Sequence, residues 1–184
     1  LEKLEARAVY VAGRQIARDG KLLNALSAAV GVTPPRNTLQ LSPLQATAFA
    51  LRVNDIQHGT ARLRHIRGAR FTQWGEVDVQ IRNGEVQIPA GFSLIWVKHR
   101  HGRHEAKPQI ALLEGWGELR GAIATSYSHD SHNLVVLGRN AEDMALAANQ
   151  LIASGGGMAL AQNGDILAHV AMPIAGMLSD KPAE

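Results

Sequence analysis

A stretch of hydrogen-bonding side chains lies between two short apolar runs, and this pattern constrains the fold more than any other part of the chain. The first run is Gly121-Ala122-Ile123-Ala124, and the second is Leu134-Val135-Val136-Leu137-Gly138. Apolar runs of this length are typical of buried strands. Five consecutive polar side chains lie between them, namely His129, Asp130, Ser131, His132 and Asn133. We therefore predict two strands joined by a polar loop at the edge of a sheet, where binding residues are often displayed.

The segment after the second run carries the clearest helix signal. Asn140 is a good N-cap, and Asp143 places an acidic side chain in the first turn. An apolar stripe with helical spacing follows, made of Met144, Ala147, Ala148, Leu151 and Ile152. Gly155 supplies the left-handed conformation that commonly ends a helix. These signals predict a helix over 141–154.

Period-two alternation predicts a largely β region over residues 37–99. Residues 49–53 and 77–81 alternate between apolar and polar side chains, and the second run leads into Asn83-Gly84, the strongest short hairpin signal. The same logic predicts a hairpin after the helix, which turns at Asn163-Gly164. The expected fold class is therefore α+β, with a largely antiparallel or mixed sheet and a packed helix.

The N-terminal part is expected to form a short β appendage. Residues 6–18 predict a hairpin that turns at Gly13, and the following connector ends in Pro34-Pro35, which excludes a continuing helix or central strand. We place the domain boundary there. The predicted domains are residues 1–35, with the connector, and residues 36–184.

Composition excludes several classes of protein. Hydrophobic residues make up 46% of the 184 residues, which is enough for the core of one domain with a small appendage. No apolar run approaches the roughly 20 residues of a membrane helix, and no secretory signal is visible, so we expect no membrane partner. The chain has no cysteine, which excludes disulfides and thiolate ligands and suits a cytoplasmic protein.

Two basic clusters raise the alternative of a non-catalytic binding module with a basic surface. The clusters are Arg62, Arg64, Arg67 and Arg70, and then Lys98, Arg100, Arg103 and Lys107. Such clusters could bind nucleic acid, but they are also ordinary solvated strand and loop faces. The net charge is only +3, and no interleaving with aromatic residues suggests a base-stacking platform. Nucleic acid is therefore not the favoured partner. The alternative requires the first cluster to form one continuous positive face.

The polar stretch from His129 to Asn133 allows more than one chemical interpretation. A Ser–His–Asp triad is excluded, because adjacent residues in an extended segment diverge and cannot form the required chain of hydrogen bonds. His129, Asp130 and His132 offer metal-ligand types, but residues three apart in an extended segment face opposite sides, and catalytic zinc usually takes three well-arranged ligands. We therefore expect no metal or cofactor site in this chain. A hydrogen-bonded structural loop remains an alternative to a functional one.

Two other motifs invite a functional interpretation that the physics opposes. His99-Arg100-His101 follows a predicted strand like a metal-binding His-x-His pair, but no later ligands accompany it, and a polar turn that runs into Gly102 is the simpler interpretation. Gly155-Gly156-Gly157 resembles a phosphate loop, yet it follows the end of a helix, where carbonyl groups point outward. Anions bind at helix N-termini, so helix termination explains the glycines better.

Several short strings, in order and with plausible spacing, resemble the C-terminal region of the bacterial adenine deaminases, which are metal-dependent hydrolases of the amidohydrolase superfamily. The strings are Arg100-His101-Gly102, Gly115-Trp116-Gly117, Gly121-Ala122, Ser128 to Asn133, Glu142 to Ala145, Gly155 to Gly157, and Pro173 to Asp180. They cover roughly the second half of the chain. Residues 9–20 are similar to the end of the small β domain that flanks the barrel in this family.

The resemblance implies a parent enzyme that converts adenine and water into hypoxanthine and ammonia. It also implies a divalent metal, manganese or iron with zinc as a third candidate, held on a (β/α)8 barrel. A barrel of that kind needs about 250 residues, so we expect this chain to be an excised or truncated C-terminal piece that is inactive alone. The implied partners are the barrel, adenine and further copies in a homo-oligomer. His129, Asp130, Ser131, His132, Asn133, Arg100 and His101 become candidates for docking to the barrel or for shaping its substrate site.

Overall fold

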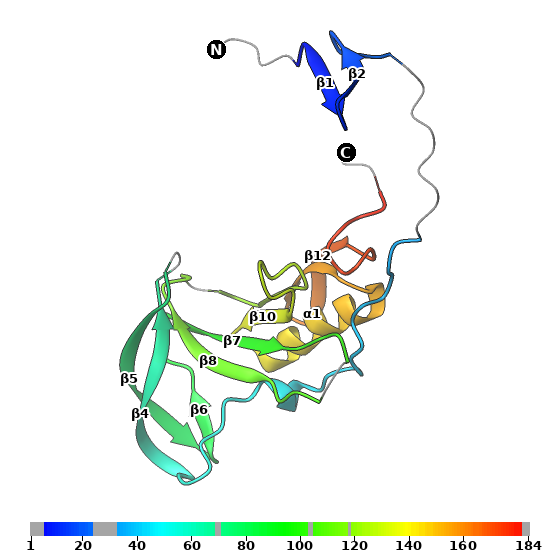
Figure 1. The fold of residues 1–184 in the computed structure, drawn as a ribbon. Helices are drawn as coiled ribbons and strands as arrows, with labels where there is room; N and C mark the ends of the chain where they lie inside the picture. The colour runs from blue at the N-terminus through cyan, green and yellow to red at the C-terminus, as the bar shows by residue number, and fades with distance from the viewer. Residues whose placement is uncertain (1–5, 24–32, 69–70, 103–104, 118, 182–184) are drawn as a thin grey trace. The chain divides into compact units, whose positions relative to one another are not determined.

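The computed structural model describes residues 6–23, 33–68, 71–102, 105–117 and 119–181. Contacts divide the chain into a smaller unit, Leu1–Thr33, and a larger unit, Pro34–Glu184. The smaller unit is a three-stranded antiparallel sheet in the order β1-β2-β3, with β1 at Ala8–Val11, β2 at Arg14–Arg18 and β3 at Lys21–Leu22 (Figure 1). The predicted N-terminal hairpin is confirmed, since the chain turns between β1 and β2 at Ala12 and Gly13, both with positive φ. Most of the predicted connector, residues 24–32, lies outside the described residues.

The larger unit is built on a nine-stranded mixed sheet in the order β12-β11-β9-β10-β7-β8-β4-β5-β6. The first five strands of this unit are β4 His58–Arg67, β5 Gln73–Arg82, β6 Glu85–Gln87, β7 Phe92–Lys98 and β8 Gln109–Glu114. The others are β9 Ala122–Thr125, β10 Leu134–Gly138, β11 Gly157–Gln162 and β12 Asp165–Ala171. Neighbouring strands are antiparallel except for β4 and β8, which pair in parallel. The α+β class and the two buried strands around the polar loop are confirmed, with β9 and β10 as adjacent interior strands.

The helix α1, Ala141–Ser154, covers one face of this sheet, and its predicted caps are confirmed. The Asp143 backbone N–H donates to Asn140 Oδ1 at 2.8 Å, and Gly155 adopts a left-handed conformation with φ 77°. The helix buries Met144, Ala147, Ala148 and Leu151 in the core beside alanines of β9 and β11. Small side chains on these strands allow the helix to approach the sheet closely, and burial of the stripe stabilises the packed pair.

The strand predicted over residues 49–53 is wrong. Residues Ala46–Phe49 form the 3-10 helix η1, and only Arg52 makes an isolated bridge, to Glu85. Phe49 is fully buried, with its ring centroid 4.8 Å from that of Trp96, and Trp96 Nε1 donates to the Ala48 carbonyl at 2.9 Å. The apolar residues of this segment alternate because one side of an irregular segment is buried. Tertiary contacts here override the local β propensity. None of the helices in the described part is long and apolar enough to cross a membrane.

Candidate functional site

The polar loop, defined as Ser128–Asn133, joins the ends of β9 and β10 in a tight and partly strained conformation. The His132 N–H donates to the Ser128 carbonyl at 2.7 Å, and the Ser131 N–H donates to the His129 carbonyl at 2.9 Å. Asp130 and His132 have φ values of 68° and 49°, which non-glycine residues seldom adopt. Residues held in such conformations persist only where the surrounding structure fixes them, and they concentrate at functional sites.

The buried side chain of Arg100 holds the backbone of this loop in place through a hydrogen bond. Its side chain is fully buried, and its guanidinium group donates to three separate segments: Nε to the His132 carbonyl, Nη1 to Thr38 Oγ1, and Nη2 to the Ala175 carbonyl at 3.0 Å. Burial lowers the pKa of this guanidinium from its ordinary value, yet arginine remains charged at neutral pH. The sequence places Arg100 among the candidates but gives no sign that it is buried.

Two residues beside Arg100 complete the support of the loop. Ser126, at the end of β9, is fully buried; its hydroxyl donates to the Gly176 carbonyl at 2.6 Å and accepts from the Gly157 N–H at 2.8 Å. Gly176 has a φ of 68°, and a Cβ at this position would lie 2.6 Å from Arg100 Nη1. The site therefore requires glycine there, which gives a structural reason for part of the Pro173–Asp180 string.

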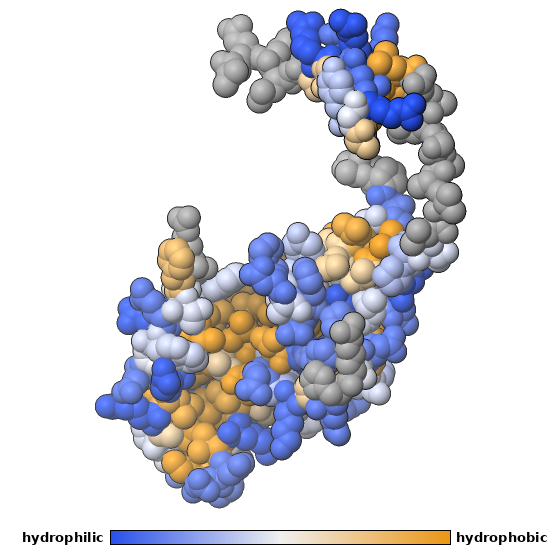
Figure 2. All heavy atoms as spheres, viewed as in Figure 1, coloured by the Kyte–Doolittle hydropathy of each residue, from blue (hydrophilic) through white to orange (hydrophobic). Residues whose placement is uncertain are grey.

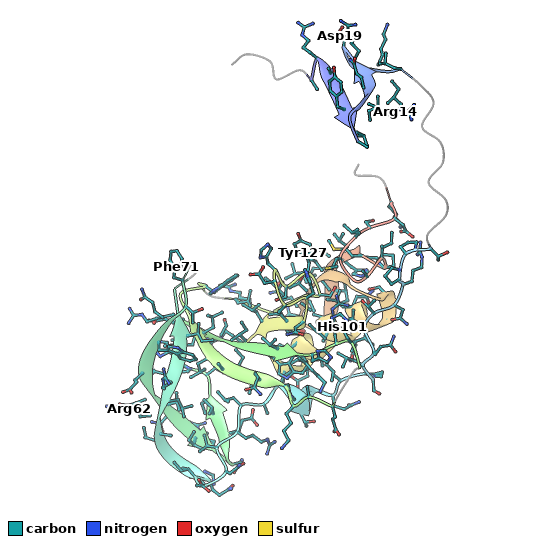
Figure 3. The ribbon with its side chains drawn as sticks, in the orientation of Figure 1. Arg14, Asp19, Arg62, Phe71, His101 and Tyr127 are labelled. Atoms are coloured by element: carbon teal, nitrogen blue, oxygen red, sulfur yellow. The ribbon has the colours of Figure 1, made fainter. Side chains whose placement is uncertain are left out.

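The loop presents its remaining polar groups to solvent. The His129 and Asp130 side chains are 83% and 91% exposed, with His129 Nδ1 3.0 Å from Asp130 Oδ1. The Ser128 and Ser131 hydroxyls lie 3.0 Å apart, whereas His132 and Asn133 are half-buried. Tyr127, just before the loop, is also exposed (Figure 3). Such groups can bind and orient a polar partner.

The described residues do not fit the metal that the resemblance implies. No group of three or more His, Cys, Asp or Glu side chains in the described part of the chain is arranged to hold a metal ion. His101 is half-buried, and its ring centroid lies 5.4 Å from that of His99. The structure thus brings Arg100 and the polar loop together.

Thr38 is missing from the sequence analysis, and Ala175 appears there only as part of the Pro173–Asp180 string. Thr38 and Ala175 contact Arg100 from segments that lie 62 and 75 residues away along the chain, and no local pattern links them to it. Ala175 has a φ of 53° and its N–H donates to the Pro35 carbonyl. The glycine triplet at 155–157, as predicted, ends the helix and leads into β11.

The arginine cluster on β4 does not form one free positive face. Arg62 makes two hydrogen bonds to Asp78, at 2.8 and 3.0 Å, and this contact lowers the pKa of the Asp78 carboxyl. Arg64 stacks over Trp74, 4.4 Å from the ring centroid, and Arg67 Nε lies 3.7 Å from a Glu114 carboxylate oxygen. Because side chains alternate along a strand, Arg67 points to the face opposite Arg62 and Arg64. Arg70 lies outside the described residues.

The fold and the loop define a class of protein: an α+β domain whose polar loop, set on a buried arginine, can contact and orient a partner. Residues 69–184 match the family described as the adenine deaminase C-terminal domain. The chain belongs to this family, and the resemblance noted in its motifs is confirmed.

Named relatives agree with this assignment over the whole chain. An adenine deaminase of Klebsiella pneumoniae subsp. pneumoniae is 79% identical over 183 residues, and one of Serratia proteamaculans is 72% identical, each covering 100% of this chain. The "Adenine deaminase 2" of Rhizobium meliloti is 45% identical over 96% of the chain. The chain spans only about 30% of the length of these relatives.

Proposed function

We propose that this chain is the C-terminal domain of an adenine deaminase, an enzyme that converts adenine and water into hypoxanthine and ammonia. The observation that carries the proposal is the match over the full chain to proteins of that name, at up to 79% identity among those cited. We place the divalent metal of the parent enzyme, manganese or iron, outside this domain, because the described residues offer no cluster of metal ligands.

Within the parent enzyme, we assign the polar loop a positioning role. Its exposed groups would dock against the barrel and shape the mouth of the substrate site, while Arg100 holds the loop backbone in place. The strained φ values of Asp130 and His132 support this role, because strain of this kind is retained where a fixed geometry is needed. Residues 1–35 would be the end of the small β domain beside the barrel and the connector that follows it.

We also propose that the parent enzyme is a homo-oligomer. The outer edge strand of the larger unit, β12, carries exposed Leu167 and Val170, at 56% and 52% exposure. An edge strand with apolar side chains can pair with the same strand of another copy. This pairing would not involve the polar loop, which lies at the ends of two interior strands.

A hybrid enzyme tests the proposed reaction directly. In it, this chain replaces the matching 183-residue segment of the Klebsiella pneumoniae adenine deaminase. We expect the hybrid to release ammonia from adenine with kcat/KM within about tenfold of the Klebsiella enzyme, because an exchange of compatible domains keeps the reacting groups in place.

The matched control is the Klebsiella enzyme with the same segment deleted, which should lose activity if the domain supports the site. A hybrid that folds with a cooperative melting transition but releases no ammonia from adenine would contradict the proposal.

A further inference from the structure

One face of the nine-stranded sheet is covered by α1, whereas part of the opposite face is exposed in the described structure. Side chains alternate along each strand, so residues next to the buried ones point away from the helix. On β7, for example, Leu94 and Trp96 belong to the core, whereas Ile95 and Val97 are half-exposed on the other side. The same alternation on β11 buries Ala159 and leaves Met158 42% exposed.

Cross-strand pairing aligns these outward residues in two rows, which we call the bare face. One row is Val170, Met158, Thr125, Val135, Val97 and Gln109. The other is Ala168, Leu160, Ile123, Leu137, Ile95 and Ala111. Of these, Leu137 is buried, at 8% exposure. Only two of the twelve side chains, Thr125 and Gln109, are polar. The rows cross six strands without a charge, so this is one continuous apolar surface.

A hollow of about 400 Å³ continues the bare face beyond β8. Its lining includes Ile95, Val97 and Ala111 of the bare face, together with Ile66 and Trp74 from β4 and β5. Figure 2 shows a broad hydrophobic area over the middle of the larger unit, in the region where Figure 1 draws β4, β7 and β8. An apolar area of this kind is comparable with the largest patch of a typical soluble monomer, and such patches are often functional.

The size of the bare face argues against a second copy as its main occupant. With strands ~4.8 Å apart and ~3.3 Å per residue, two rows across six strands cover roughly 400 Å². A stable complex between separate proteins buries about 800 Å² on each partner. A covalently connected partner needs less area, because tethering raises its effective concentration to about the millimolar range. Some 70% of the length of the relatives lies outside the part that this chain matches.

We propose that the bare face binds the remaining part of the adenine deaminase polypeptide, through an apolar surface of that part. This inference rests on the proposed function, since it takes the longer enzyme as the natural setting of the domain. The polar loop borders the same face, because Thr125 and Val135 are paired residues of the strands that flank it. Docking there would bring the polar loop against the same partner. The bare face and the loop would then belong to one interface.

The oxidation of Met158 by hydrogen peroxide tests the inference, because methionine reacts in proportion to its exposure. Met158 should oxidise readily in the isolated chain, whereas Met144, which is fully buried, should not while the chain is folded. In the hybrid enzyme at submicromolar concentration, mass spectrometry should find Met158 oxidation slowed at least about tenfold. Equal rates for Met158 in the isolated chain and the hybrid would overturn the inference.

Two variants of the hybrid sharpen the test. Thr125→Glu places a charge on the bare face next to Met158 and should restore its fast oxidation, whereas Gln87→Glu, at an exposed position of β6 on the other edge of the sheet, should leave it protected. Protection of Met158 in the isolated chain that disappears on dilution would identify a second copy and also overturn the inference.

Ammonia release is measured on the same samples, so the two proposals can fail separately. Protection of Met158 without ammonia release would support docking and contradict only the proposed reaction. Ammonia release without protection would overturn docking alone.

Discussion

At the scale of single residues, the structure distinguishes the exposed side chains of the polar loop from the buried arginine that holds the loop backbone. Arg100 is fully buried and donates to three segments, whereas Asp130 is exposed on the loop above it. The sequence indicates both residues as candidates, because both lie in strings shared with a known family. It cannot predict the burial of Arg100, because the contacts of this side chain come from positions up to 75 residues away.

We expect Asp130→Gly in the hybrid enzyme to lower kcat/KM for adenine by about a hundredfold, because a misplaced positioning group can cost that much in rate. Glycine suits the φ of 68° at this position, so the melting temperature should stay within a few degrees of the parent. Steady-state kinetics and thermal melting on one sample separate the two effects. Normal turnover with a lower melting temperature would make the loop a structural latch.

Arg100→Ala is the comparison for Asp130→Gly, because we expect it to lower the stability of the domain. Removing this side chain leaves buried carbonyl groups without donors and should lower the free energy of unfolding by about 3 kcal/mol. Arg82→Ala, at an exposed position of β5, should change it by less than about 0.5 kcal/mol.

At the scale of elements, local signals predict much of the structure. The Asn140 cap, the glycine at 155 and the turns at Asn83-Gly84 and Asn163-Gly164 all occur where the sequence indicates. The strand order and the parallel β4–β8 pair are not predicted, because they depend on contacts between distant segments. Residues 49–53 fail for the same reason, since burial against Trp96 produces an alternation without a strand.

Asp143 connects the start of α1 to the β11–β12 hairpin. Its carboxylate accepts from the backbone N–H groups of Asn163, at 3.1 Å, and Gly164, at 2.8 Å. We expect Asp143→Ala to lower the free energy of unfolding by about 2 kcal/mol, because two N–H groups lose their acceptor. Asn140→Ala, which removes only the cap, should cost about 1 kcal/mol. Urea denaturation measures both; equal costs, or a smaller cost for Asp143→Ala, would show that the carboxylate does not join the two elements.

At the scale of the whole molecule, the sheet has two different faces. The helix-covered face completes a core within this chain, whereas most residues of the bare face stay partly or fully exposed in the described structure. Alternation along single strands could predict which residues point outward, but only the strand order shows that they form two continuous rows. Such a surface fits the proposed docking of this domain within a longer enzyme.

The most direct test of this view is ammonia release from adenine by the isolated chain, with manganese, iron or zinc added in turn. We expect no release above background, because the described residues offer no cluster of side chains that could hold the metal of the parent enzyme. The hybrid enzyme, assayed in parallel, is the positive control. Release of ammonia by the isolated chain that is abolished by a chelator would show that the chain carries a complete catalytic site, and would contradict its assignment as a docking and positioning domain.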